Sequence, residues 1–141
     1  MATEYSVRRE IAAPADRVWT LLTDASSYGR WNGSLLSIEG EIVEGGTVSL
    51  VPRANPGRTF KLRVSDVRAP TRMTWSDGMP LGLFRGVRTF ELTARGGSTV
   101  FSMREVYSGP LAGLISRSIP DMTESFEQFA DGLREAAESA G

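Results

Sequence analysis

The segment Arg85–Tyr107, with the sequence RGVRTFELTARGGSTVFSMREVY, decides how this chain can fold. Gly96 and Gly97 separate two runs of alternating apolar and polar residues, a pattern typical of two antiparallel strands joined by a two-residue turn. If the two glycines form the turn, the register of the whole hairpin follows. One face then pairs Leu92 with Phe101, Phe90 with Met103, and finally Arg88 with Glu105. The apolar face of the hairpin therefore ends in two opposite charges.

Length and composition indicate one ordinary globular domain over residues 1–141. The chain is 40% hydrophobic and 23% charged with a formal net charge of −1, so no basic surface points to nucleic acid. No apolar run approaches the roughly 20 residues that span a bilayer, and residues 1–10 lack the apolar core of a signal peptide. We therefore expect a cytoplasmic protein that neither binds nucleic acid nor inserts into a membrane. The composition leaves the oligomeric state open.

The residue types that are absent exclude several kinds of site. The sequence contains no histidine and no cysteine, so Ser-His and Cys-His nucleophilic schemes and imidazole or thiolate metal sites are impossible. No Asp-rich loop offers itself to a hard cation, and we expect neither a metal nor a cofactor. Lys61, the sole lysine, falls on the solvent face of a predicted strand, away from any Schiff-base role. These absences favour a binding protein over an enzyme.

Alternation and capping signals place the elements that precede the hairpin. Residues 3–11 alternate as a strand, and Pro14 suits the first turn of a helix. Asp24 suits the cap of a second short helix that puts Tyr28 and Trp31 on one face. Four further strands are predicted around residues 36–42, 48–50, 60–65 and 72–76, the first two joined by a second double-glycine turn at 45–46.

After Tyr107 the apolar period changes from two residues to three or four, which predicts an amphipathic helix. Pro120 interrupts this pattern, so we expect either a kink or a short helix followed by a longer one. The apolar stripe consists of Leu111, Leu114, Ile115, Ile119, Met122, Phe126, Phe129 and Leu133.

Together these elements predict an α+β fold with seven antiparallel strands, two short helices after the first strand, and a long C-terminal helix. A sheet with one apolar face needs a cover, and only the C-terminal helix is long enough to supply it. A curved sheet wrapped around one helix tends to leave an apolar cavity between the two.

Several segments, in this order, resemble the START/Bet v 1-like (SRPBCC) superfamily and, within it, the polyketide cyclase/dehydrase-like group. They are IAAPADRVWTLLTD (11–24), YGRWN (28–32) followed by IEG (38–40), MTWSDG (73–78), and STVFSMREVYSGPLAGLI (98–115) running into FEQFADGL (126–133). The resemblance implies a helix-grip fold that holds a hydrophobic small molecule. Gly33 departs from the pattern, because relatives commonly have proline after the WN pair, and this implies a looser loop near the pocket mouth.

The concave sheet face and the helix that covers it supply most candidate ligand-binding residues. Aromatic and methionine side chains suit an adaptable apolar pocket, although the same residues can equally fill a core. Leu92 and Phe101, nearest the hairpin turn, are expected to be core only. The candidates are Phe60, Leu62, Met73, Trp75, Phe90 and Met103 on the strands, and Ile119, Met122 and Phe126 on the helix.

Two further segments near the expected cavity have alternative interpretations. Trp31 either contacts a ligand or plugs the space between the second short helix and the sheet. The loop Met79–Phe84, rich in glycine and apolar residues, is either a lid that places Met79 and Phe84 on the ligand or an ordinary connector between strands.

Arg88, Glu105 and Tyr107 form a predicted polar cluster at the end of the apolar face. One interpretation is a pair at the sheet edge that reaches solvent and contributes about 0–1 kcal/mol. The other is a polar anchor for a ligand inside an apolar cavity, where loss of one partner would cost about 3–5 kcal/mol. Arg9, on the same face of the first strand, is a weaker candidate for this region.

The sequence supports three functions in decreasing order. The first is binding of a hydrophobic, partly oxygenated small molecule such as a lipid, a polyketide or an aromatic metabolite. The second is an aromatase/cyclase or dehydrase that acts on a polyketide-type substrate, in which Arg88 stabilises an enolate and Glu105 or Tyr107 moves protons. A carboxylate beside an arginine is a poor acid near neutrality, which counts against the second function. The third, a chaperone-interacting module, follows from the resemblance alone.

Overall fold

The predicted hairpin lies at the centre of the sheet in the computed structural model, which describes residues 4–139. Strand β6 (Arg85–Arg95) pairs with β7 (Ser98–Ser108) in the predicted register, with Arg95 opposite Ser98 and Arg88 opposite Glu105. Gly96 adopts a φ of 61°, in the left-handed region that this kind of turn requires. The register prediction is therefore confirmed.

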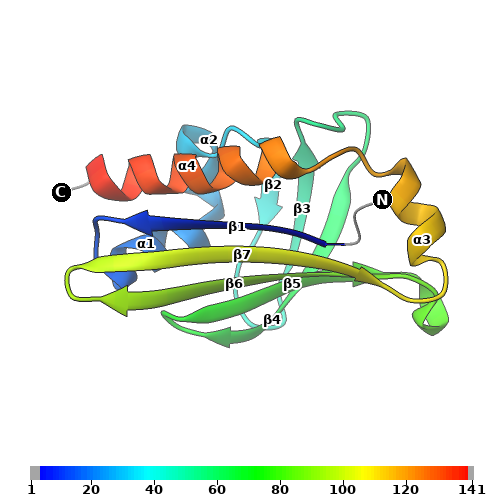
Figure 1. The fold of residues 1–141 in the computed structure, drawn as a ribbon, viewed down its shortest axis with the longest axis horizontal. Helices are drawn as coiled ribbons and strands as arrows, with labels where there is room; N and C mark the ends of the chain where they lie inside the picture. Colours follow the sequence, from blue (N-terminus) through cyan, green and yellow to red (C-terminus); the bar gives the residue numbers. More distant parts are fainter. Residues whose placement is uncertain (1–3, 140–141) are drawn as a thin grey trace.

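All seven strands form one antiparallel sheet, in the order β1-β7-β6-β5-β4-β3-β2 (Figure 1). The predicted α+β helix-grip architecture is confirmed. Thr3, at the start of the first predicted strand, lies outside the described residues. The five strands outside the hairpin are β1 (Glu4–Ile11), β2 (Leu35–Gly40), β3 (Thr47–Pro52), β4 (Phe60–Arg68) and β5 (Arg72–Gly78).

The helical segments also follow the sequence signals. Pro14 directly precedes α1, and the Asp24 carboxylate accepts a hydrogen bond from the Ser26 N–H at 3.1 Å. A short helix followed by a longer one flanks Pro120, as the second of the two predicted alternatives states. The segments are α1 (Ala15–Thr23), η1 (Ala25–Ser27), α2 (Tyr28–Trp31), η2 (Pro80–Gly82), α3 (Ala112–Ile115), η3 (Ser116–Ser118) and α4 (Thr123–Ser139).

Two details of the predicted apolar pattern are wrong. The strand predicted around residues 36–42 is β2, which ends at Gly40 and not at Ile42. A register shift between Leu35 and Ser37 turns Leu35 toward the cavity and leaves Leu36, at the start of the predicted strand, 49% exposed. Leu114, assigned to the apolar stripe, is 64% exposed, because α3 is separate from α4 and does not continue its buried face.

Helix α4 runs along the concave face from the α3 end of the molecule toward the β6–β7 turn (Figure 1). We call the half of this face near the turn, where Phe129 and Leu133 of α4 are fully buried, the closed end. The other half, where α4 begins, is the cavity end. Among residues 4–139, no helix combines the length and hydrophobicity needed to cross a membrane.

Candidate ligand-binding cavity

A cavity of about 120 Å³ lies at the cavity end, between the sheet, the segment that contains Pro120 and the first turns of α4. The break at Pro120 creates it, because the chain there leaves the sheet uncovered by regular helix. The segment from Pro52 to Phe60, which joins β3 to β4, borders the same space. Most of the exposed surface of the wall is apolar.

Many of the predicted ligand-binding residues line this cavity. They are Phe60, Leu62, Trp75, Phe84, Arg88, Glu105, Tyr107, Ile119, Met122 and Phe126. Their side chains come from four strands and from both sides of the Pro120 break, so residues far apart in the sequence meet here. Whether they contact a ligand remains a prediction.

Three strand residues predicted to line the pocket pack in the core at the closed end instead. Met73, Phe90 and Met103 are each at most 1% exposed and are absent from the cavity wall. They form one cross-strand row, two residues closer to the turn than Trp75, Arg88 and Glu105. Phe129 of α4 covers this row, with its ring centroid 5.8 Å from that of Phe90, so these side chains pack as core.

Trp31 does not line the cavity. It fills the space beside the second short helix, as the alternative interpretation of this residue states. Its ring packs 4.6 Å from Tyr28 and 5.6 Å from Phe129, and its indole N–H donates to Ser27 Oγ at 3.0 Å. Helix α4 approaches it so closely that a Cβ on Gly132 would overlap the Trp31 carbonyl oxygen. Trp31 therefore locks α2 against α4.

The loop Met79–Phe84 contributes a single residue to the wall. The Phe84 ring stacks on Tyr107 with centroids 5.8 Å apart, whereas Met79 is 42% exposed and absent from the wall. The carbonyl of Leu83 accepts a hydrogen bond from the Leu111 N–H at 2.9 Å, which ties the loop to the start of α3. This arrangement matches the connector interpretation better than the lid.

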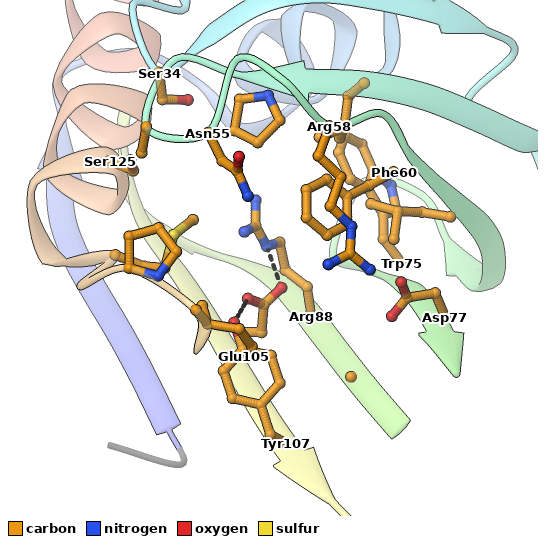
Figure 2. Close-up of a pocket in the computed structure, with 18 of the residues that line it drawn as sticks. Ser34, Asn55, Arg58, Phe60, Trp75, Asp77, Arg88, Glu105, Tyr107 and Ser125 are labelled. Atoms are coloured by element: carbon orange, nitrogen blue, oxygen red, sulfur yellow. Dashed lines mark hydrogen bonds and ion pairs between the residues drawn. The ribbon is translucent and has the colours of Figure 1, made fainter. Parts of the chain in front are cut away.

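Arg88, Glu105 and Tyr107 form one hydrogen-bonded chain in the cavity wall (Figure 2). Arg88 Nε donates to Glu105 Oε1 at 3.0 Å, and the Tyr107 hydroxyl donates to Glu105 Oε2 at 2.6 Å. The Arg88 and Glu105 side chains are only 11% and 14% exposed. The Arg88 guanidinium also lies 4.8 Å from the centre of the Phe126 ring, in cation–π geometry. A solvent-exposed pair at the sheet edge, the first of the two interpretations, is thus wrong.

Arg88 keeps unused hydrogen-bond donors. A guanidinium has five N–H groups, and Glu105 is its sole hydrogen-bond partner within residues 4–139. Figure 2 shows Asn55 pointing toward this guanidinium from the segment between β3 and β4. Arg9 plays no part here, because it pairs with Asp131 of α4 at 2.8 Å and clamps β1 to the helix.

Burial, followed by the negative charge of Glu105, raises the pKa of Tyr107 above its ordinary value. The hydroxyl therefore keeps its proton at any physiological pH and holds it toward Glu105. Both oxygens of Glu105 are occupied, one by Arg88 and one by Tyr107. Glu105 and Tyr107, the two groups predicted to move protons, are therefore hydrogen-bonded to each other.

Sequence reasoning missed Asp77, whose carboxyl lines the cavity on the same face of β5 as Trp75. Side chains two residues apart on a strand lie on the same face, so the prediction that Trp75 faces the cavity should have included Asp77 as well. Arg58 and Asn55 were also missed, and no periodicity could have found them because they lie in an irregular segment. The other residues that were missed are Ser34, Leu35, Leu50, Pro52, Ala54, Gly86, Ile115, Ser118, Pro120 and Ser125.

Gly86 forms part of the cavity floor, between Asp77 on β5 and Tyr107 on β7. A Cβ at this position would lie 3.2 Å from Asp77 Oδ1 and 3.5 Å from the Tyr107 ring. The missing side chain therefore leaves the notch between these two residues open. A larger side chain would fill it.

Trp75 lines the cavity and carries a buried donor without a partner in the described part of the chain. Its indole N–H is buried and has no hydrogen-bond acceptor within residues 4–139. A buried donor without a partner costs about 1–3 kcal/mol and is uncommon in folded proteins.

The family model described as "Polyketide cyclase / dehydrase and lipid transport" matches residues 2–138. The chain belongs to this family. The family description names both an enzymatic and a lipid-carrying activity, and the match itself does not choose between them. No functionally curated protein matches the chain.

Solved structures share the fold at low sequence identity. A protein from Rhodobacter sphaeroides is similar with a TM-score of 0.74 and 21% identity, covering 100% of this chain and 95% of its own. A START superfamily protein from Mycobacterium smegmatis has a TM-score of 0.71 and 16% identity, covering 99% and 100%. DynU16, described as a putative protein in the dynemicin biosynthetic locus, has a TM-score of 0.68 and 16% identity, covering 99% and 49%. These likenesses establish the helix-grip fold.

Proposed function

We propose that the protein binds a small hydrophobic molecule in the cavity, with Arg88 as its polar anchor. The observation that carries the proposal is the combination of a mostly apolar wall with a buried guanidinium that keeps free donors. An apolar pocket with a few convergent polar groups is the usual layout of a small-molecule site. The family description, which includes lipid transport, supports the same reading.

The size of the cavity limits what fits without rearrangement. Drug-sized ligands occupy about 300–1,000 Å³, whereas an apolar cavity of about 150 Å³ is enough for benzene. At about 120 Å³ the cavity is slightly smaller than that, so a single substituted ring requires a modest widening at the open border of the cavity. A complete lipid or polyketide would require movement of exposed groups at its border, such as Arg58, which stacks 4.6 Å over the Phe60 ring.

Native mass spectrometry of the protein purified from its own host tests the proposal. We expect a co-purifying small molecule with wild type and its loss with Gly86→Val, which fills the notch beside Asp77 and Tyr107. Gly97→Val is the matched control, because its Cβ meets nothing within 4 Å and the turn lies at the closed end. Absence of any co-purifying ligand, together with no thermal shift across a library of lipids, polyketides and aromatic metabolites, would contradict the proposal.

A catalytic role as a cyclase or dehydrase is the second candidate, and the family description favours it. The free donors of Arg88 suit a developing enolate oxygen. Glu105 and Tyr107 suit proton transfer poorly, because each is committed to the other. Incubation of a reactive polyketide surrogate with wild type, Arg88→Ala and Glu105→Gln tests this candidate. Equal product profiles for all three would argue against it.

A further inference from the structure

The Asp77 carboxyl is a cavity group with no assigned role. It is half-buried, and it makes no hydrogen bond or ion pair within residues 4–139. Figure 2 shows it at the border of the cavity, with the Arg58 guanidinium pointing toward it. A carboxyl that is partly removed from water and left without a partner is destabilising for the protein alone. Such a group is explained if a bound molecule supplies the missing hydrogen bond.

Asp77 and Arg88 face the cavity from neighbouring strands. Asp77 lies opposite Gly86 on β6, and Arg88 is two residues further along the same face. Diagonal neighbours of this kind are about 7–8 Å apart in a sheet. One presents a hydrogen-bond acceptor and the other presents donors, with the notch at Gly86 beside Asp77. A single small molecule can therefore meet both.

The charges in the wall favour a neutral molecule. Its charged side chains are two guanidiniums, Arg58 and Arg88, and two carboxylates, Asp77 and Glu105. The two carboxylates would repel an anion, and the two guanidiniums would repel a cation. For either ion, attraction to the wall would therefore not offset the free energy lost with its hydration shell. A neutral carbonyl oxygen suits the donors of Arg88, and a hydroxyl group suits the carboxylate of Asp77.

We propose that the cavity recognises a neutral, single-ring compound that carries a carbonyl group bound by Arg88 and a hydroxyl group that donates to Asp77. This inference rests on the proposed function, and it assigns the class of ligand and the specificity-determining residue. Burial, followed by the charge of Glu105, raises the pKa of Asp77, so its ionised form gains from each hydrogen bond that it accepts.

The test compares two probes, 4-hydroxyacetophenone and acetophenone, by isothermal titration calorimetry with wild type, Asp77→Ala and Asp77→Asn. The probes differ by the hydroxyl group alone, so the ratio of their affinities isolates its contribution. We expect wild type to bind the hydroxylated probe at least about tenfold more tightly. The ratio should fall to about one in Asp77→Ala and take an intermediate value in Asp77→Asn. Asp16→Asn, at an exposed position in α1, should leave the ratio unchanged.

The possible failures have different meanings. If acetophenone binds wild type and the hydroxyl group adds nothing, the assignment of Asp77 is overturned while cavity binding stands. A tenfold preference that persists in Asp77→Ala overturns the assignment in the same way. If neither probe binds wild type at millimolar concentration, the inference and the proposed function both fail for ligands of this size. The wild-type ratio alone decides the question if Asp77→Ala does not fold, and Asp77→Asn preserves the shape of the side chain.

Discussion

The closed end and the cavity end of the concave face are built from the same strands and have opposite properties. At the closed end the Phe129 ring lies 5.6–6.3 Å from the rings of Trp31, Tyr28, Phe90 and Phe101, which pack together as buried core. At the cavity end the corresponding row of side chains contains Arg88 and Glu105, and the cover is interrupted at Pro120. In this protein the cavity therefore lies where the cover over the sheet changes from the Pro120 segment to the first turns of α4.

The two ends also differ in how their polar groups are hydrogen-bonded. At the closed end the Trp31 N–H donates to Ser27 Oγ, whereas the buried side-chain NH₂ of the adjacent Asn32 has no acceptor within residues 4–139. At the cavity end the Asp77 carboxyl, the Trp75 N–H and donors of Arg88 have no hydrogen-bond partner among the described residues 4–139. Because unsatisfied polar groups cost stability, Asp77 and Arg88, which both line the cavity, are the groups there that a bound molecule would satisfy.

The largest expected effect is on the closed end. Phe129→Ala should lower the free energy of unfolding by about 3–5 kcal/mol, because it removes a fully buried ring at the centre of an aromatic cluster. Phe84→Ala is the matched change at the cavity end and should cost about 1 kcal/mol, since that ring is half-buried and stacks on Tyr107. Urea denaturation measures both. Equal losses of unfolding free energy for the two variants would contradict the difference in packing between the two ends.

The next effect concerns the buried ion pair. Arg88→Met should destabilise the protein by about 3 kcal/mol, because Glu105 keeps a buried charge with Tyr107 as its remaining partner. The double variant Arg88→Met/Glu105→Leu should recover most of this loss, since it removes both charges together. A double variant as unstable as the single one would mean that the pair itself holds the sheet together.

Gly132→Ala tests the close approach of α4 to α2. Alanine is normally more favourable than glycine inside a helix by about 1 kcal/mol, but here its Cβ would overlap the Trp31 carbonyl oxygen. We expect a net loss of about 1–3 kcal/mol in thermal or urea unfolding. Gly113→Ala in α3, where the new Cβ meets nothing within 4 Å, should be neutral or slightly stabilising. Stabilisation by Gly132→Ala would show that the closed end is loosely packed.

The smallest effect is the pH dependence contributed by Asp77. Burial and Glu105 raise its pKa, and Arg58 and Arg88 partly oppose them, while Tyr107 lies beyond Gly86. The folded state therefore keeps the Asp77 proton to a higher pH than the unfolded chain does, because the pKa of an aspartate in an unfolded chain is about 4. Stability contributed by Asp77 falls as pH rises through this window.

Asp77→Asn should accordingly raise Tm by about 1–2 °C at pH 7, with the gain shrinking toward pH 4. Differential scanning calorimetry across this range measures it, with Asp16→Asn as an exposed control that should show no gain. A gain that grows toward acidic pH would reverse the assigned direction of the Asp77 pKa.

The sheet was predictable in detail because the Gly96-Gly97 turn and two-residue alternation together determine which residues pair. The cavity was only partly predictable, because alternation identifies a face and does not say where a helix covers it. Phe90 and Trp75 have the same sequence pattern, yet Phe129 lies over the first and the second lines the cavity. Asn55 and Arg58 depend on the path of an irregular segment that no periodic signal describes.

The central claim is that the cavity end binds a small molecule while the closed end is filled core. Titration of ¹⁵N-labelled protein with acetophenone, followed by ¹H–¹⁵N correlation spectra, tests it most directly. The account predicts saturable shifts for the amides of Gly86, Arg88 and Phe126, and little change at Leu92 and Leu133. No saturable shifts, or the largest shifts at the closed end, would contradict it.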